Sequence, residues 1–163
     1  MLYFAYGSNL SVRRIQARAS SAKVYGTFYL QEFELLFHKR GRDGSGKCDA
    51  FFTGRKEDVT YGRVYEISPA DKDSLDHCEG LGRGYETKEV LIRNTAGKTC
   101  SAFTYVATDI ASKLVPFCWY REHVLVGAIE AMFPRSYIEK TITVSCRRDP
   151  DQDRRKKELS IYT

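Results

Sequence analysis

The sequence has no apolar run close to the roughly 18–20 residues of a membrane-spanning helix, which argues against a membrane protein. Its first residues lack the basic start and long apolar stretch of a secretory signal peptide. Histidine is scarce, with three residues, and the five cysteines form no Cys-x-x-Cys pair. These shortages argue against a metal site and against a disulfide framework. We therefore expect a cytoplasmic protein with reduced cysteines and no bound metal.

Acidic residues are fewer than basic ones, and the net charge is +5. Residues 147–159 hold six basic and four acidic side chains with almost nothing apolar, so we expect residues 147–163 to form a basic, flexible tail. Arg13, Arg14 and Arg18 form a second cluster, which we assign to the exposed face of a helix. The chain contains no nucleic-acid-binding motif, and this argues against an RNA or DNA partner.

The remaining sequence, residues 1–146, has the pattern of one α+β domain without repeats or an internal linker. Helices are expected from Ser68-Pro69 to about Glu79, where a capping residue precedes proline, and over 119–133. The strand-like segments predict a sheet of about six strands, closed into a small β-barrel flanked by helices. These segments are 2–6, 23–37, 49–54, 59–67, 85–93 and 99–107.

The stretch "FAYGSNL", residues 4–10, joins an apolar strand to a polar turn and then to the helical pattern "SVRRIQAR". Glycine, serine and asparagine favour turns, and serine or asparagine also caps helices. Backbone N–H groups at such a junction suit a carboxylate or an oxyanion. Taken alone, so short a motif favours the alternative, a strand–turn–helix connection that has no function.

A second candidate functional residue is Glu79, in the stretch "SPADKDSLDHCEGL". It follows Leu75 by four residues, so both project from one helical face, and Gly80 ends the helix after it. The inward orientation, the negative end of the helix dipole and nearby Asp76 each oppose ionisation of this carboxyl. Glu79 is therefore a candidate general base, whereas the alternative is a glutamate at a frayed helix end that points to water.

Together, "FAYGSNL", "LDHCEG", "GYETKEV" and "SAFTYVA" resemble the γ-glutamylcyclotransferase family over residues 2–145. The Tyr-Gly-Ser-Asn loop is similar to that of the general branch of the family. The resemblance implies a small mixed β-barrel, a catalytic carboxylate at Glu79, no cofactor, and a monomer or homodimer. It also assigns substrate-binding residues, the first five of them in the loop: Tyr6, Gly7, Ser8, Asn9, Leu10, Tyr85, Tyr105 and Tyr120.

The activity implied by this resemblance is cyclisation of a γ-glutamyl amine or γ-glutamyl amino acid, which releases 5-oxoproline. The substrate's own α-amine is the nucleophile, so a base is needed but no serine, cysteine or metal is. The alternative is a non-catalytic module that kept the γ-glutamyl pocket. A thiol amidase built on His77 and Cys78 is disfavoured, because adjacent helical residues point about 100° apart. We expect Cys78 in the core and His77 at the surface.

Overall fold

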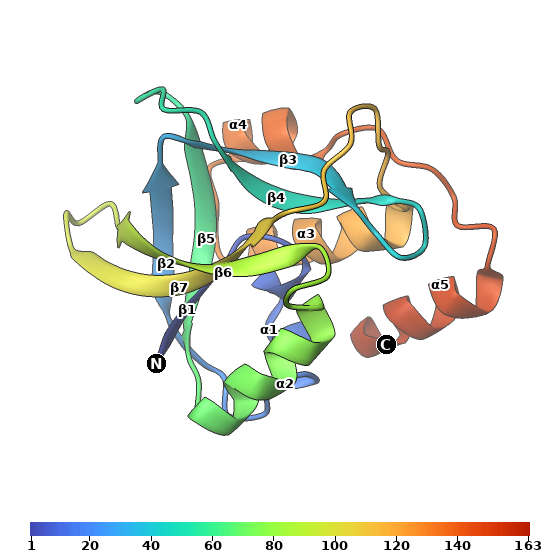
Figure 1. Cartoon of the computed structure of the whole chain (residues 1–163), viewed down its shortest axis with the longest axis horizontal. Coiled ribbons are helices and arrows are strands. Elements are labelled where there is room, and N and C mark those ends of the chain that lie inside the picture. The colour runs from blue at the N-terminus through green and yellow to red at the C-terminus, as the bar shows by residue number, and fades with distance from the viewer.

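The computed structural model describes all residues, 1–163, and its centre is a closed five-stranded barrel (Figure 1). Neighbouring strands pair antiparallel except for β1 and β7, which pair parallel through Tyr3 and Phe103. The α+β class and the mixed barrel are thereby confirmed. In barrel order the strands are β1 (Leu2–Ala5), β5 (Val59–Glu66), β2 (Lys23–Gln31), β6 (Tyr85–Arg93) and β7 (Thr99–Ala107).

The long strand expected over 23–37 is in fact two strands that belong to different sheets. The chain leaves the barrel at Glu32, whose φ of 68° turns the backbone between β2 and β3. β3 (Phe33–Arg40) then pairs with β4 (Gly46–Phe52) in a separate two-stranded sheet. The predicted count of about six strands therefore becomes five in the barrel and two beside it. The glycine-rich segment 41–45 forms a tight turn between β3 and β4.

The first strand is apolar throughout because both of its faces are buried. Phe4 lies in the larger core with residues of β2, β5 and the long helix α3 (Cys118–Glu130), whereas Tyr3 and Ala5 lie in a second core beneath helix α2. Alternate side chains of a strand point to opposite faces, so β1 separates the two cores. The residues of the turn that follows β1, Ser8–Leu10, are also buried.

Helix α2 (Pro69–Glu79) begins and ends as predicted. The Ser68 side chain accepts a hydrogen bond from the Asp71 amide, and Gly80 ends the helix with a φ of 70°. Leu75 is fully buried in the second core. The other helical segments are α1 (Val12–Gln16), α4 (Arg135–Tyr137), α5 (Gln152–Leu159), and the short turns η1 (Ser8–Leu10), η2 (Ile138–Ile142) and η3 (Ser160–Tyr162). None of the helices has the length and apolar character needed to cross a bilayer.

The C-terminal segment differs from the expected flexible tail, because it forms α5 and packs against α3. Asp149 is buried and accepts hydrogen bonds from Trp119 Nε1 at 2.7 Å and Arg154 Nε at 2.6 Å. A disulfide between Cys118 and Cys146 also ties this segment to the start of α3, contrary to the expectation of reduced cysteines throughout. Local composition predicts solvation here because Trp119 and the rest of α3, against which the segment packs, lie far away in sequence.

Candidate active site

Two adjoining cavities meet next to the C-terminal end of α2. The outer one is an open cleft of about 440 Å³ between the β3–β4 turn, α2, α3 and α5. The inner one, of about 20 Å³, has room for about one water molecule, and five of its ten lining residues are tyrosines. Ser8, Glu79, Tyr85 and Tyr120 line both cavities. These four residues mark the junction where a ligand in the cleft would reach the interior.

The loop predicted to bind substrate forms one wall of the inner cavity. Tyr6, Gly7, Ser8 and Asn9 line it, whereas Leu10 is fully buried in the larger core and does not. Leu10 donates its amide to the Gly7 carbonyl at 3.0 Å, whereas the amides of Ser8 and Asn9 donate to no backbone carbonyl. The expected helix N-terminus is a single turn, η1, followed by the five residues of α1. An anion at this loop would therefore be bound by the free amides of the loop and not by the dipole of a long helix.

Position 7 requires glycine because Cys48 and Tyr120 approach its backbone closely. A Cβ atom there would lie 3.1 Å from Cys48 Cβ and 3.4 Å from the Tyr120 hydroxyl. The φ of Gly7 is −108°, so its backbone is not in the left-handed region. A larger side chain would therefore have to displace β4 or fill the space beside Tyr120.

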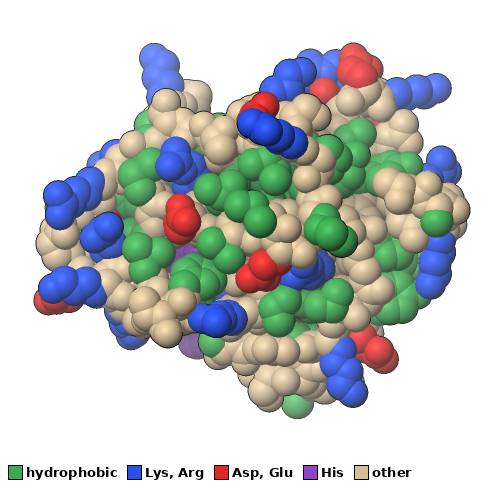
Figure 2. Space-filling model, turned by 180° about the vertical axis from the view of Figure 1, so that it is seen from behind, with side chains coloured by type: hydrophobic (Ala, Val, Ile, Leu, Met, Phe, Trp, Pro, Cys, Tyr) green, Lys and Arg blue, Asp and Glu red, His purple; other side chains and the backbone are tan.

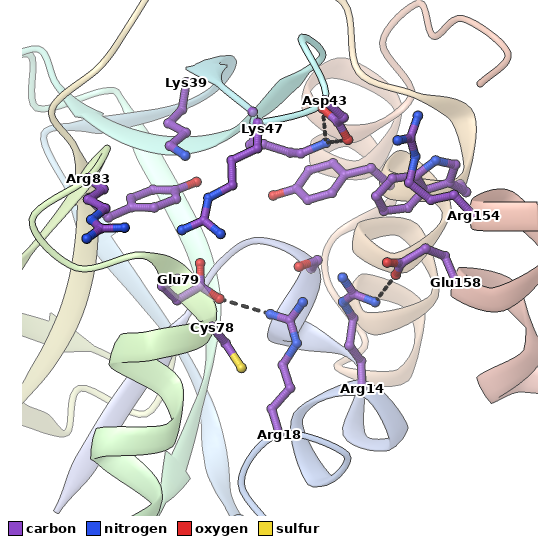
Figure 3. Close-up of a pocket in the computed structure, with 16 residues that line it drawn as sticks. Arg14, Arg18, Lys39, Asp43, Lys47, Cys78, Glu79, Arg83, Arg154 and Glu158 are labelled. Atoms are coloured by element: carbon purple, nitrogen blue, oxygen red, sulfur yellow. Dashed lines mark hydrogen bonds and ion pairs between the residues drawn. The ribbon is translucent and has the colours of Figure 1, made fainter. Parts of the chain in front are cut away.

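Glu79 is fixed by two partners and keeps one oxygen free. Its Oε1 accepts hydrogen bonds from Asn9 Nδ2 and from Arg18, both at 3.0 Å, and Arg18 also donates to Asn9 Oδ1 at 2.9 Å. The protein supplies no hydrogen bond to Oε2, and Figure 3 shows this oxygen directed into the cleft. The Glu79 side chain is 17% exposed, so a ligand in the cleft can reach it.

The charges around Glu79 differ from those that the sequence predicts. Asp76 is engaged elsewhere: it pairs with Lys72 Nζ at 2.6 Å and accepts a hydrogen bond from the Tyr105 hydroxyl at 2.6 Å. The charged group in contact with Glu79 is Arg18, from the cluster that the sequence assigned to an exposed helical face. No local pattern indicates this pair, because sixty-one positions separate the two residues.

The four tyrosines assigned to the pocket all line the inner cavity. Tyr6 donates its hydroxyl to the Tyr105 carbonyl, and Tyr85 donates to the Cys48 carbonyl. Tyr120 instead accepts a hydrogen bond from the Cys48 amide at 3.0 Å, which leaves its own proton available. Burial raises the pKa of each of these phenols above its ordinary value, so all four are neutral.

The two cysteines close to the site have different surroundings. Cys48 is buried, and burial raises the pKa of its thiol, so it remains protonated. Cys78 is exposed and lines the cleft, contrary to the expectation of a core position, but His77 does not line the cavity beside it. No group of three or more His, Cys, Asp or Glu side chains is arranged to hold a metal ion. The arrangement therefore offers a carboxylate with a free oxygen, neutral phenols and free amides.

Comparison with known proteins gives relatives that cover most of the chain. The family model described as AIG2-like family matches residues 59–141. Human and bovine proteins named gamma-glutamylcyclotransferase are each 33% identical over 144 residues, covering 85% of this chain and 76% of theirs. A solved structure named gamma-glutamyl cyclotransferase superposes with a TM-score of 0.79 at 29% identity, covering 96% of this chain and 98% of that one. With its barrel, its loop and its Glu79 in this arrangement, the chain belongs to the γ-glutamylcyclotransferase family.

Proposed function

We propose that this protein is a γ-glutamylcyclotransferase that converts a γ-glutamyl amine or γ-glutamyl amino acid to 5-oxoproline and the free amine or amino acid. The observation that carries the proposal is the position of Glu79 at the junction of the two cavities, with Oε1 held by Asn9 and Arg18 and Oε2 free. A carboxylate held in this way has a fixed direction in which to take or give a proton.

The reaction needs two proton transfers and no protein nucleophile. Glu79 takes a proton from the substrate's α-ammonium group, and the resulting amine attacks the γ-carbonyl carbon to close a five-membered ring. The ring nitrogen gives up a second proton, and both protons pass by way of Glu79 to the leaving nitrogen. The bond from the γ-carbon to that nitrogen breaks, and the leaving group departs as an ammonium ion. Holding the two reacting groups of one molecule in line supplies much of the rate, since effective molarities reach about 10⁵–10⁸ M.

The polar wall beside Glu79 suits the rest of the γ-glutamyl group. The amides of Ser8 and Asn9 are available for either the α-carboxylate or the oxyanion that forms on the γ-carbonyl. The Tyr120 hydroxyl is a second donor at the same junction. The inner cavity holds only about one water, so the γ-glutamyl group occupies the junction and the leaving group extends into the cleft.

The test is the Glu79→Gln variant, assayed by mass for 5-oxoproline with γ-glutamyl-alanine, glutathione, a γ-glutamyl-lysine isopeptide and a γ-glutamyl amine. Glutamine keeps the shape and the contact with Arg18 but cannot titrate. We expect turnover to fall by more than about 100-fold, the scale of general acid–base catalysis, while the melting temperature and 5-oxoproline binding change little.

The matched control is Glu86→Gln, which removes a carboxylate from an exposed position of β6 outside both cavities. It should retain the parent rate. A Glu79→Gln protein that keeps more than about one hundredth of this rate would refute the role of Glu79. Release of glutamate in place of 5-oxoproline would refute the cyclisation itself.

A further inference from the structure

The outer cleft is strongly basic. Seven Lys and Arg side chains line it, against three Asp and Glu. Each of the three acids is already paired, Glu79 with Arg18, Glu158 with Arg14 and Asp43 with Lys47. Arg154 pairs with Asp149, which lies outside the cleft lining. Lys39, Arg42 and Arg83 remain, and none of the three has an acidic partner within ion-pair distance.

Lys39 is the most informative of these cations, because it is buried as well as unpaired. The residue is 7% exposed, and its Nζ has no hydrogen-bond acceptor in the protein and lies 4.5 Å from the centre of the Tyr85 ring. Burial lowers the pKa of Lys39, and the charge of Glu79 opposes that effect. The Lys39 ammonium group opens into the cleft but is partly removed from water and has no counter-ion, and an anionic ligand in the cleft would offset the cost of that desolvation.

The backbone around Lys39 is arranged to let its side chain reach the cleft. Gly84 has a φ of 123°, and a Cβ atom at that position would lie 2.9 Å from Lys39 Cε. Only glycine accommodates both the backbone angle and this close approach. Figure 3 shows Lys39 and Arg83 on the same side of the cleft as Glu79, with Arg14, Arg154 and Glu158 on the other side.

Arg42 brings a further positive charge next to Glu79. Its Nη2 lies 3.5 Å from where a Cβ atom would stand on Gly80, so the guanidinium covers the end of α2. On the face shown in Figure 2, Lys and Arg side chains are scattered between apolar patches and do not form one continuous basic surface.

We infer that the leaving part of the substrate is anionic: the preferred substrates are γ-glutamyl derivatives of acidic amino acids or acidic peptides, bound through their carboxylates by Lys39, Arg42 and Arg83. This inference rests on the proposed function, because it assigns the cleft to the leaving group. A neutral leaving group would leave three cations uncompensated beside the reacting bond, whereas a carboxylate makes charge-assisted hydrogen bonds to them.

The test compares kcat/KM for γ-glutamyl-glutamate, γ-glutamyl-alanine and γ-glutamyl-propylamide, whose leaving amines carry two, one and no carboxylates. We expect the parent protein to prefer them in that order. Lys39→Met keeps most of the side-chain volume and should lose about 10- to 100-fold on γ-glutamyl-glutamate, the size of a lost charge-assisted hydrogen bond. On the propylamide it should lose less than about threefold.

Lys56→Met, an exposed lysine outside the cleft, is the control and should leave all three values unchanged. If Lys39→Met does not fold, the double variant Arg42→Ala/Arg83→Ala makes the same comparison at two exposed positions, with a smaller selective loss. Equal kcat/KM for the three substrates in the parent protein, or an equal loss on all three in Lys39→Met, would overturn the inference.

Failure of the proposed function has a different signature, which is no 5-oxoproline from any of the three substrates. Calorimetry on the parent protein then decides the inference by binding alone. Tighter binding of γ-glutamyl-glutamate than of γ-glutamyl-alanine supports an anion-binding cleft, and equal dissociation constants refute it.

Discussion

Mild acid should weaken the attachment of the C-terminal segment through one buried histidine. His123 lies on α3 with no exposed surface, and its Nε2 is 2.9 Å from Arg14 Nη1 while its Nδ1 is 2.8 Å from the Tyr162 hydroxyl. Arginine can only donate, so the contact with Arg14 favours an acceptor Nε2 and a neutral ring, whereas Glu158 Oε2, 3.2 Å from the same nitrogen, favours the charged ring. Burial lowers the pKa of His123 to about 4, although its contact with Glu158 favours the charged form.

The sign and size of the effect follow from this pKa. The unfolded chain takes up the proton near pH 6.5 and the folded protein only near pH 4, so the unfolded state binds more protons between these values. Stability is therefore complete above pH 6.5 and falls as the pH is lowered toward 4. Linkage gives a loss of about 2 kcal/mol between pH 7 and pH 5. Glu158, with its pKa held at about 2 by His123 and Arg14 despite burial, adds a loss only below about pH 4.5.

Urea unfolding at pH 7 and pH 5 measures this loss directly. The single tryptophan, Trp119, packs 5.9 Å from the His123 ring and reports on the same region by fluorescence. The control is His123→Gln, which keeps an acceptor for Arg14 but does not titrate, so its loss should be much smaller. A parent protein that loses less than about 0.5 kcal/mol, or a variant that loses as much as the parent, would refute the reasoning.

Three further outcomes are expected. Gly7→Val should destabilise the fold by about 1–3 kcal/mol and abolish turnover, because its side chain meets Cys48 and Tyr120; an unchanged melting curve and rate would contradict this. Tyr120→Phe removes the acceptor of the buried Cys48 amide and should cost about 1–3 kcal/mol in urea unfolding, with a raised KM if the free hydroxyl proton contacts substrate. Cys118→Ser should cost about 3–4 kcal/mol in oxidised protein and much less under reductant, since the bond to Cys146 spans 28 positions.

The parts of the fold that local patterns predicted are those whose causes are local. A serine before proline begins α2 and a left-handed glycine ends it, and these signals lie within the helix itself. Strand alternation likewise predicts β6 and β7, which pair with each other across a short turn. The position of Glu79 could be predicted for the same reason. The local signals that end α2 at Gly80 place Glu79 in the last turn of the helix, and this place sets the direction of its carboxylate.

Local patterns failed where a single residue redirects the chain. The segment 23–37 reads as one strand because both halves alternate correctly, yet Glu32 turns between them. Its amide donates to the Asp58 carbonyl, and its own carbonyl accepts from Thr53. A non-glycine residue at positive φ carries no sequence signal of its own, since tertiary contacts hold it there. The β3–β4 turn that carries Arg42 into the cleft depends on this break.

The charged residues of the site were the hardest to predict, because their partners lie far away in sequence. The same distance explains why residues 147–163 were expected to be flexible. Arg14 and Arg18 resemble the solvated face of a short helix, and Glu158 resembles one charge among many in a polar tail. The fold brings Arg14 to 2.6 Å from Glu158, across 144 positions of sequence, and Arg18 to 3.0 Å from Glu79. These two pairs neutralise the α1 side of the cleft while the β3 side, with Lys39, stays uncompensated. Docking of the C-terminal segment therefore helps to decide where in the cleft an anion can bind.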